Sequence, residues 1–199
     1  MNITEKEAQK EILKRNENLP GAKRWSRLDF LVWFLTVVCV ALCIRAVIFT
    51  PVRVKGRSME NTLFGKDYMF VEKLSYTVTD MKRGDIIICY FPQNNEYSCV
   101  KRIIGLPGET VEIRNGTVFV NGIQLNEPYV TTEVNSLHDG IWVVEKDTVF
   151  ALGDHRRVSH DSSARDVGCI PMERVVGRVR CTLFPFGRAQ VFPHVDYDI

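Results

Sequence analysis

The sequence has little net charge, no internal repeat and no low-complexity tract, and each absence narrows the range of functions. Its 199 residues carry a formal net charge of +2 at pH 7, which argues against a dedicated nucleic-acid binder. The spacing of its 6 cysteines matches no metal-binding pattern. We expect the histidines to be polar surface residues rather than ligands; they are His138, His155, His160 and His194. We therefore expect no metal, no cofactor and no nucleic-acid partner.

One long apolar segment lies near the N-terminus, at residues 30–49. As a helix, about 20 apolar residues cover the roughly 30 Å hydrocarbon core of a bilayer. We therefore predict a single transmembrane anchor over residues 28–50, preceded by a tail over residues 1–27. A buried core helix fits the length and apolarity less well. A cleaved secretion signal is the other alternative, but the run exceeds the usual signal-peptide core and no clean small-x-small site follows it.

Basic residues flank this segment on both sides, so the positive-inside bias is modest. They are Lys10, Lys14, Arg15, Lys23, Arg24 and Arg27 before it, and Arg53, Lys55, Arg57 and Lys66 after it. Long domains translocate largely regardless of flanking charge. We expect a cytoplasmic N-terminus and an extracytoplasmic domain over residues 51–199.

The rest of the chain has the residue pattern of a β-domain. Short β-branched and aromatic runs separated by turn residues predict antiparallel strands and a mainly β fold. The runs are Tyr68–Val71, Ile86–Phe91, Cys99–Ile104, Thr110–Ile113, Thr117–Val120, Trp142–Val144, Thr148–Leu152 and Val175–Thr182. Two Asn-Gly pairs, Asn115-Gly116 and Asn121-Gly122, predict tight hairpins.

Four cysteines lie in this predicted domain. Cys89 and Cys99 flank a predicted hairpin loop, and Cys169 and Cys181 form the other conceivable pair. Disulfides would form only in an oxidising compartment and only with matched geometry. We expect reduced, buried thiols, and the sequence leaves both pairings open.

Two residues carry candidate chemistry. Ser58 follows the apolar segment, and Lys101 lies in a predicted strand next to Arg102. Neighbouring strand residues face opposite sides, so only one of these two cations can share a pocket with Ser58. A serine hydroxyl needs a base to take its proton, and burial can lower a lysine pKa enough to provide one, whereas arginine stays charged. A structural serine and a solvated basic pair are the alternatives.

Four segments together resemble the conserved boxes of bacterial type I signal peptidases in order and spacing. They are Gly-x-Ser-Met-x-x-Thr-Leu at 56–63, Gly-Asp-Ile at 84–86, Val-Lys-Arg-Ile-Ile-Gly-Leu-Pro-Gly at 100–108, and Gly-Asp-His-Arg at 153–156 with Ser159 and Asp161-Ser162 after it. The likeness runs from the apolar segment nearly to the C-terminus. The short stretch between Gly108 and Gly153 is similar to the compact Gram-positive-like form.

The resemblance implies a serine–lysine dyad. Ser58 would be the nucleophile and Lys101 the general base, with Met59 packed beside them. The Ser58 backbone amide would contribute to the oxyanion hole, and Gly56 stands where other members have a side-chain donor.

The resemblance also implies a set of supporting residues. Gly153 would leave room near the lysine, and Ser159 would hydrogen-bond its amine. Arg102 would pair with Asp154 on the far side of the strand, and Asp161 would brace the loop.

By the same resemblance, the protein would be a single-pass plasma-membrane serine endopeptidase that removes signal peptides from exported preproteins. Its partners would be those signal peptides and the lipid bilayer. Shallow pockets would accept small residues at the first and third positions before the cut, and main-chain pairing to strand edges would supply affinity. Residues 53–56 and 98–100 are the candidate edges.

Three positions depart from the family pattern. Asn61 replaces the usual proline, His155 the usual asparagine, and Ser163 the usual arginine after Asp-Ser. Arg157 or Arg165 could compensate for the last. These changes threaten loop rigidity more than chemistry. They leave two further readings: a catalytically silent homologue that binds exported chains, and a specialised signal peptidase with few substrates.

Overall fold

The computed structural model describes residues 26–73, 81–93, 97–131 and 138–192 with Val195 and Tyr197, although not the side chains of residues 43–50. The predicted tail over residues 1–27 lies almost entirely outside these residues. The chain divides into two compact units, one ending at Ile44 and one beginning at Arg45.

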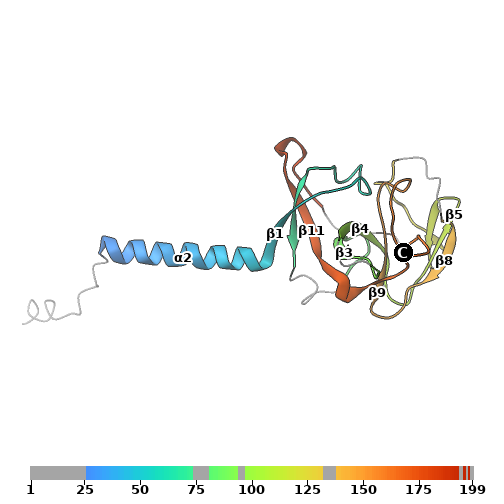
Figure 1. Cartoon of the computed structure of the whole chain (residues 1–199), viewed down its shortest axis with the longest axis horizontal. Helices are drawn as coiled ribbons and strands as arrows, with labels where there is room; N and C mark the ends of the chain where they lie inside the picture. Colours follow the sequence, from blue (N-terminus) through green and yellow to red (C-terminus); the bar gives the residue numbers. More distant parts are fainter. Residues whose placement is uncertain are drawn as a thin grey trace, which may run out of the picture. The chain divides into compact units, whose positions relative to one another are not determined.

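Most of helix α2 (Arg27–Ile48), drawn in blue in Figure 1, belongs to the first unit. Its first turn is capped reciprocally: the Asp29 amide donates to the Ser26 hydroxyl, and the Ser26 amide donates to the Asp29 carboxylate, both at 3.0 Å. Such an arrangement satisfies two of the amides that a helix N-terminus leaves unpaired. The helix therefore starts where the sequence provides a cap.

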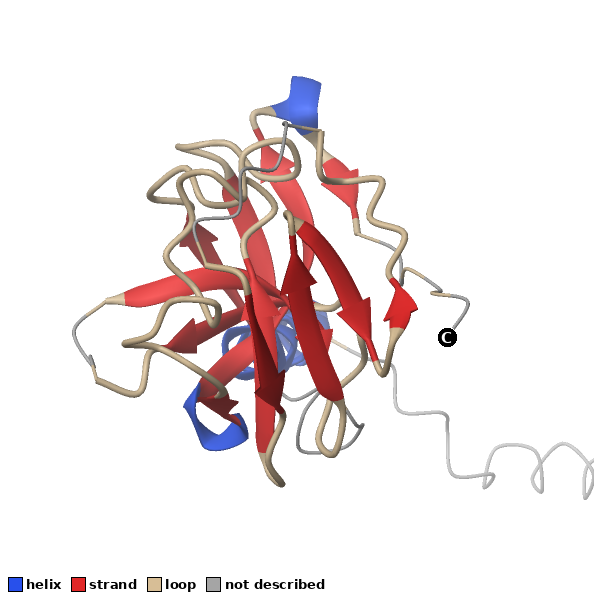
Figure 2. Cartoon of the chain, turned by 90° about the vertical axis from the view of Figure 1, so that its right-hand side faces the viewer, coloured by secondary structure: helices blue, strands red, loops and turns tan. Residues whose placement is uncertain are grey.

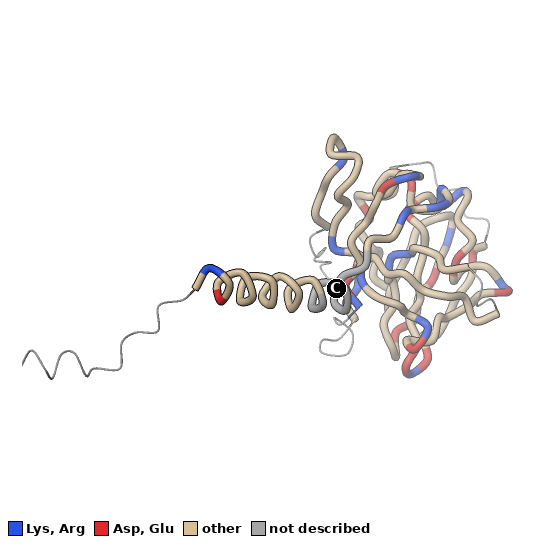
Figure 3. The backbone as a smooth tube through the Cα atoms, turned by 60° about the vertical axis from the view of Figure 1, so that its left-hand side comes forward, with Lys and Arg blue, Asp and Glu red and all other residues tan. Residues whose placement is uncertain are grey.

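The described side chains of α2 are exposed and mostly apolar. Leu28, Phe30 and Trp33, for example, are 50–69 % exposed. Between Phe30 and Leu42 the helix carries no Asp, Glu, Lys or Arg (Figure 3). Within the described residues, no helix reaches the combination of length and apolarity that a membrane-spanning segment requires.

The second unit is built from two antiparallel sheets (Figure 2). Among the described residues, the larger has eight strands in the order β1-β2-β11-β3-β4-β9-β10, with β12 paired to β11, and the smaller has the order β7-β6-β5-β8. The strands are β1 (Phe49–Arg53), β2 (Tyr68–Glu72), β3 (Ile86–Tyr90), β4 (Ser98–Gly105), β5 (Thr110–Arg114), β6 (Thr117–Val120), β7 (Ile123–Gln124), β8 (Gly140–Val143), β9 (Thr148–Leu152), β10 (Ile170–Pro171), β11 (Val175–Phe184) and β12 (Gln190–Val191). Short 3-10 helices, η1 (Met172–Arg174) and η2 (Phe186–Arg188), flank β11.

The mainly β, antiparallel fold predicted from the sequence is confirmed. Each predicted run corresponds to a strand, displaced by at most two residues at either end. Both Asn-Gly pairs form hairpin turns with positive φ at each residue, 50° and 76° at Asn115 and Gly116, and 51° and 83° at Asn121 and Gly122. Two positive φ values are the signature of the type I′ turn that matches strand twist.

Strand β1 was not predicted, because its first residues continue the apolar composition of the helix before it. It is the edge strand of the larger sheet, paired on one side with β2. That position explains how the strand accommodates Pro51, which cannot donate to a ladder and is tolerated at an edge.

Apolar side chains fill the space between the sheets and anchor the loops. One cluster joins Ile104 and Phe150 of the larger sheet to Val111 and Val118 of the smaller. Another holds Met59 beneath the larger sheet. The loop after β1 is therefore fixed by core packing.

Candidate active site

Core packing and backbone hydrogen bonds fix the loop after β1, which carries Ser58. Met59 and Leu63 are 2 % and 0 % exposed, and the Leu63 amide donates to the Met59 carbonyl at 2.8 Å. At the base of the loop, the amide of Val54 donates to the carbonyl of Asp67 at 2.8 Å. Ser58 itself is half-buried on this firmly held backbone.

Gly56 adopts a φ of 92°, a conformation that residues with a Cβ rarely adopt. A Cβ added there would meet no atom within 4 Å. Backbone conformation, rather than lack of space, therefore requires glycine at this position.

Lys101 lies in the middle of β4, opposite Ile87 of β3, and is 2 % exposed. Its Nζ donates to the Ser159 hydroxyl at 3.2 Å. Burial lowers the pKa of the Lys101 amine below its usual range, although the Asp161 carboxylate opposes the shift. Burial therefore shifts the protonation equilibrium of this amine toward its neutral form.

Gly153, at the end of β9, brings the serine and lysine segments together. A Cβ at this position would lie 2.2 Å from the Ser159 Oγ and 2.5 Å from the Ser58 carbonyl oxygen. The Ser58 carbonyl also accepts a hydrogen bond of 3.0 Å from the His155 amide. The hydroxyl that holds Lys101 and the backbone of Ser58 thus contact the same glycine.

Asp161 braces this arrangement by accepting four hydrogen bonds. The Gly153 amide donates at 3.0 Å and the Ser159 hydroxyl at 2.5 Å. The amide and hydroxyl of Ser163 donate at 3.2 and 2.8 Å. Ser163 thus satisfies the carboxylate oxygen that the usual arginine was expected to bind.

Arg102 points to the opposite face of β4 and is 4 % exposed. Its guanidinium binds both Asp154 carboxylate oxygens, at 2.9 and 2.7 Å, and donates to the Gly84 carbonyl at 3.0 Å. The Thr62 hydroxyl donates to the same carboxylate at 2.5 Å. Asp154 therefore links β4 to the loop that carries Ser58.

A buried network that the sequence did not predict contacts the segment from Gly153 to Arg156. Arg156 donates to the Gly153 carbonyl at 3.1 Å and pairs with Glu127 at 2.5 Å. The Tyr129 hydroxyl donates to Glu127 at 2.7 Å, while its ring stacks 3.9 Å from the Arg102 guanidinium carbon. Only the place of Arg156 as the last residue of the Gly-Asp-His-Arg box could have drawn attention to it; nothing in the sequence pairs it with Glu127.

The other two departures alter local geometry. Asn61 has a φ of 97°, which the ring of the usual proline could not adopt. The His155 side chain is only 14 % exposed, with its Nδ1 3.3 Å from the Glu60 carboxylate, so it is more covered than expected of a surface histidine. His194 lies outside the described residues.

Cys89 and Cys99 are direct cross-strand partners on β3 and β4, with their sulfur atoms 3.6 Å apart as free thiols. Their mutual hydrogen bond raises the pKa of Cys89 and lowers that of Cys99. Cys169 and Cys181 are also free. No group of three or more His, Cys, Asp or Glu residues in the described part of the chain is arranged to hold a metal.

Comparison with known proteins decides the family. Residues 27–184 match the family described as signal peptidase, peptidase S26. The chain belongs to this family. It is 34 % identical over 175 residues to Signal peptidase I P of Bacillus subtilis subsp. natto, covering 83 % of this chain and 94 % of that protein.

Two further members are similar over different shares of this chain. Signal peptidase I of Bacillus amyloliquefaciens is 33 % identical over 181 residues, covering 86 % of this chain and 96 % of that protein. The crystal structure of a signal peptidase I from Enterococcus faecalis V583 is 32 % identical, covering 51 % of this chain and 97 % of that one, with a TM-score of 0.44. Membership makes this chain a serine-type endopeptidase.

The contacts of Gly153 lead to a first prediction. In Gly153→Ala the new methyl group must displace Ser159 or the Ser58 backbone, and displacement of about 1 Å can cost about 100-fold in rate. We expect kcat/KM on a preprotein to fall by about that factor. Gly65→Ala is the matched control, because its new Cβ would meet its nearest atom at 3.9 Å. Equal rates for the two variants would contradict the assigned role of Gly153.

Proposed function

We propose that this signal peptidase cleaves exported preproteins with Ser58 as nucleophile and Lys101 as general base. The observation that carries the proposal is the buried Lys101 amine, held by Ser159 against the glycine that contacts the Ser58 backbone. Neutral Lys101 takes the Ser58 proton, and Ser58 attacks the scissile carbonyl to form an acyl-enzyme. Lys101 passes the proton to the leaving amine and then activates the water that releases the signal peptide.

The backbone amide of Ser58 is the proposed oxyanion donor. Its position is supported by the carbonyl of the same residue, which the His155 amide holds at 3.0 Å, and by buried Met59 on its other side. A donor held before the reaction stabilises developing charge without reorganisation, and losing one costs about a hundred- to thousand-fold in rate.

Two strand edges are proposed to bind the substrate backbone. β1 pairs with β2 on one side and is the edge of the larger sheet. β9 pairs with β4 from Arg102 onward, so the pairing does not cover Ser98–Val100. An extended peptide could therefore add main-chain hydrogen bonds at both edges.

We further propose that α2 anchors the enzyme in the plasma membrane, with the N-terminus cytoplasmic and the β unit extracytoplasmic. Its 22 residues span about 33 Å. Large apolar side chains are exposed along its described length, and the apolar run of the sequence continues from Leu42 to Phe49 with Arg45 as its one charged residue. Exposed apolar surface of this kind is stable in lipid.

The central test uses the full chain in detergent with a purified preprotein. Ser58→Ala should lower kcat/KM at least about 1,000-fold, and Lys101→Arg should do the same because a guanidinium cannot lose its proton. Lys82→Arg, an exchange at an exposed lysine, should leave the rate unchanged. N-terminal sequencing should place the cut after a small residue. Native-rate cleavage by Ser58→Ala would overturn the proposal, and indifference to Lys101→Arg would favour a binding protein.

The proposed base also predicts a pH profile. Because the neutral amine is the active form, kcat/KM should rise as pH rises through the pKa of Lys101. Asp161 opposes the lowering of that pKa, so Asp161→Asn should move the rise to lower pH while reducing the maximum rate. Glu173→Gln removes an exposed carboxylate and should leave the profile in place. A rise that stays at the same pH in Asp161→Asn would contradict the assignment.

The anchor is tested by extraction of membranes with alkaline carbonate. The full chain should stay in the pellet, because transfer of a long apolar helix from lipid to water is strongly unfavourable. A chain beginning at Pro51 should be released. External protease should digest the β unit in intact cells after wall removal. Release of the full chain by carbonate would rule out the anchor.

A further inference from the structure

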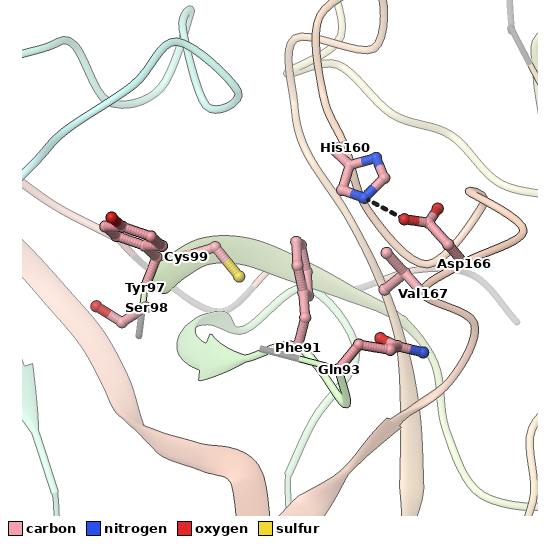
Figure 4. Close-up of a pocket in the computed structure, with 8 residues that line it drawn as sticks. All are labelled: Phe91, Gln93, Tyr97, Ser98, Cys99, His160, Asp166 and Val167. Atoms are coloured by element: carbon pink, nitrogen blue, oxygen red, sulfur yellow. Dashed lines mark ion pairs between the residues drawn. The ribbon is translucent and has the colours of Figure 1, made fainter. Parts of the chain in front are cut away.

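A pocket of about 440 Å³ opens beside the proposed base. Its floor is apolar and is formed by Phe91, Cys99 and Val167 (Figure 4). The centre of the Phe91 ring lies 5.9 Å from the Lys101 amine. Cys99 precedes Lys101 by two residues on β4 and so faces the same side of the sheet. The pocket therefore lies close to the Lys101 amine, although Lys101 is not among the residues that line it.

One rim of the pocket carries an ion pair. The Nε2 of His160 lies 3.1 Å from the Asp166 carboxylate, and their side chains are 57 % and 71 % exposed. The His160 ring meets Phe91 edge-on, with centroids 5.7 Å apart and planes at 77°. His160 directly follows Ser159, so this rim is fixed to the residue that holds Lys101.

The opposite rim is neutral. Tyr97 and Ser98 lie across Phe91 from the ion pair in Figure 4, and Tyr97 is 73 % exposed. The charged residues of the described lining are therefore His160 and Asp166. Arg174 lies nearby, but it donates to the Phe91 carbonyl at 3.1 Å.

The residues that line the pocket indicate which kind of side chain it would bind. An apolar floor with an aromatic edge-to-face pair favours a large apolar or aromatic side chain, which gains area burial and ring contacts. The exposed carboxylate of Asp166 disfavours a second carboxylate close by. The volume is far larger than the methyl group of an alanine needs.

Substrate geometry indicates which positions can reach the pocket. In an extended peptide alternate side chains face opposite ways. If the first and third residues before the cut fill small pockets on one face, the second residue before the cut and the first after it point to the other. A roomy pocket beside the base suits this second pair of positions.

We propose that this pocket binds a large apolar or aromatic substrate side chain on the face opposite the two small residues, and that Asp166 excludes an acidic one. The inference rests on the proposed peptidase function, in which the Lys101 amine, 5.9 Å from the centre of the Phe91 ring, acts as the base. It makes Phe91, His160 and Asp166 specificity-determining residues.

The test measures kcat/KM of the full chain in detergent on peptides with Ala, Leu, Phe or Glu at each of the two positions. At one of them Leu and Phe should exceed Ala by about tenfold, and Glu should fall below it. His160→Ala should reduce the preference for Phe over Ala. Asp166→Lys should raise kcat/KM for the Glu peptide relative to the Ala peptide by up to about fivefold at low salt. Glu145→Lys, a charge reversal at an exposed residue outside the lining, should alter neither.

The outcomes separate this inference from the function on which it rests. Ser58-dependent cleavage with rates that vary less than twofold among the four side chains at both positions would overturn the pocket and leave the peptidase assignment intact. Loss of all Ser58-dependent cleavage would overturn the function instead. The pocket is then judged by fluorescence anisotropy of the same peptides on Ser58→Ala protein, where equal affinities for Phe and Ala peptides would refute it.

Discussion

The burial of one amine is the constraint on which the site depends. Lys101 is 2 % exposed, and burial lowers its pKa because a charged ammonium is poorly solvated in the interior. The fold must then hold that amine without restoring its charge. It does so with a neutral hydroxyl, that of Ser159, while the Asp161 carboxylate lies one hydrogen bond further away. Ser159 thus positions the amine, and the negative charge of Asp161 stays one hydrogen bond removed from it.

The departure from the family pattern at Ser163 is offset by local hydrogen bonds. Ser163 supplies two short donors to Asp161 in place of an arginine, and the deep cation of the loop is Arg156, neither Arg157 nor Arg165. Its buried pair with Glu127 is sensitive to disruption, since removing one partner of such a pair costs about 3–5 kcal/mol. The departures therefore change how the loop is braced while the contacts around Lys101 remain.

Strand β4 combines structural support with the proposed chemistry and specificity because its side chains alternate. On one face, Cys99 lines the pocket and Lys101 provides the amine, whereas Arg102 on the other face locks Asp154 and, through Thr62, the serine loop. A shift of register by one residue would exchange these faces and remove the base from the site. Core packing of neighbouring Ile103, which is 0 % exposed, opposes such a shift.

The sequence by itself determined much of this protein: short β-branched and aromatic runs and Asn-Gly turns predicted the antiparallel strands. Four motifs in order predicted the family and named Ser58 and Lys101 as candidate catalytic residues. Local patterns carry no information about partners distant along the chain. Only the tertiary structure brought Glu127 and Tyr129 against Arg156 and placed His160 and Asp166 over Phe91. Some of those contacts join segments 29 or more residues apart, and others depend on how a loop folds over a sheet. Both kinds form only through tertiary packing.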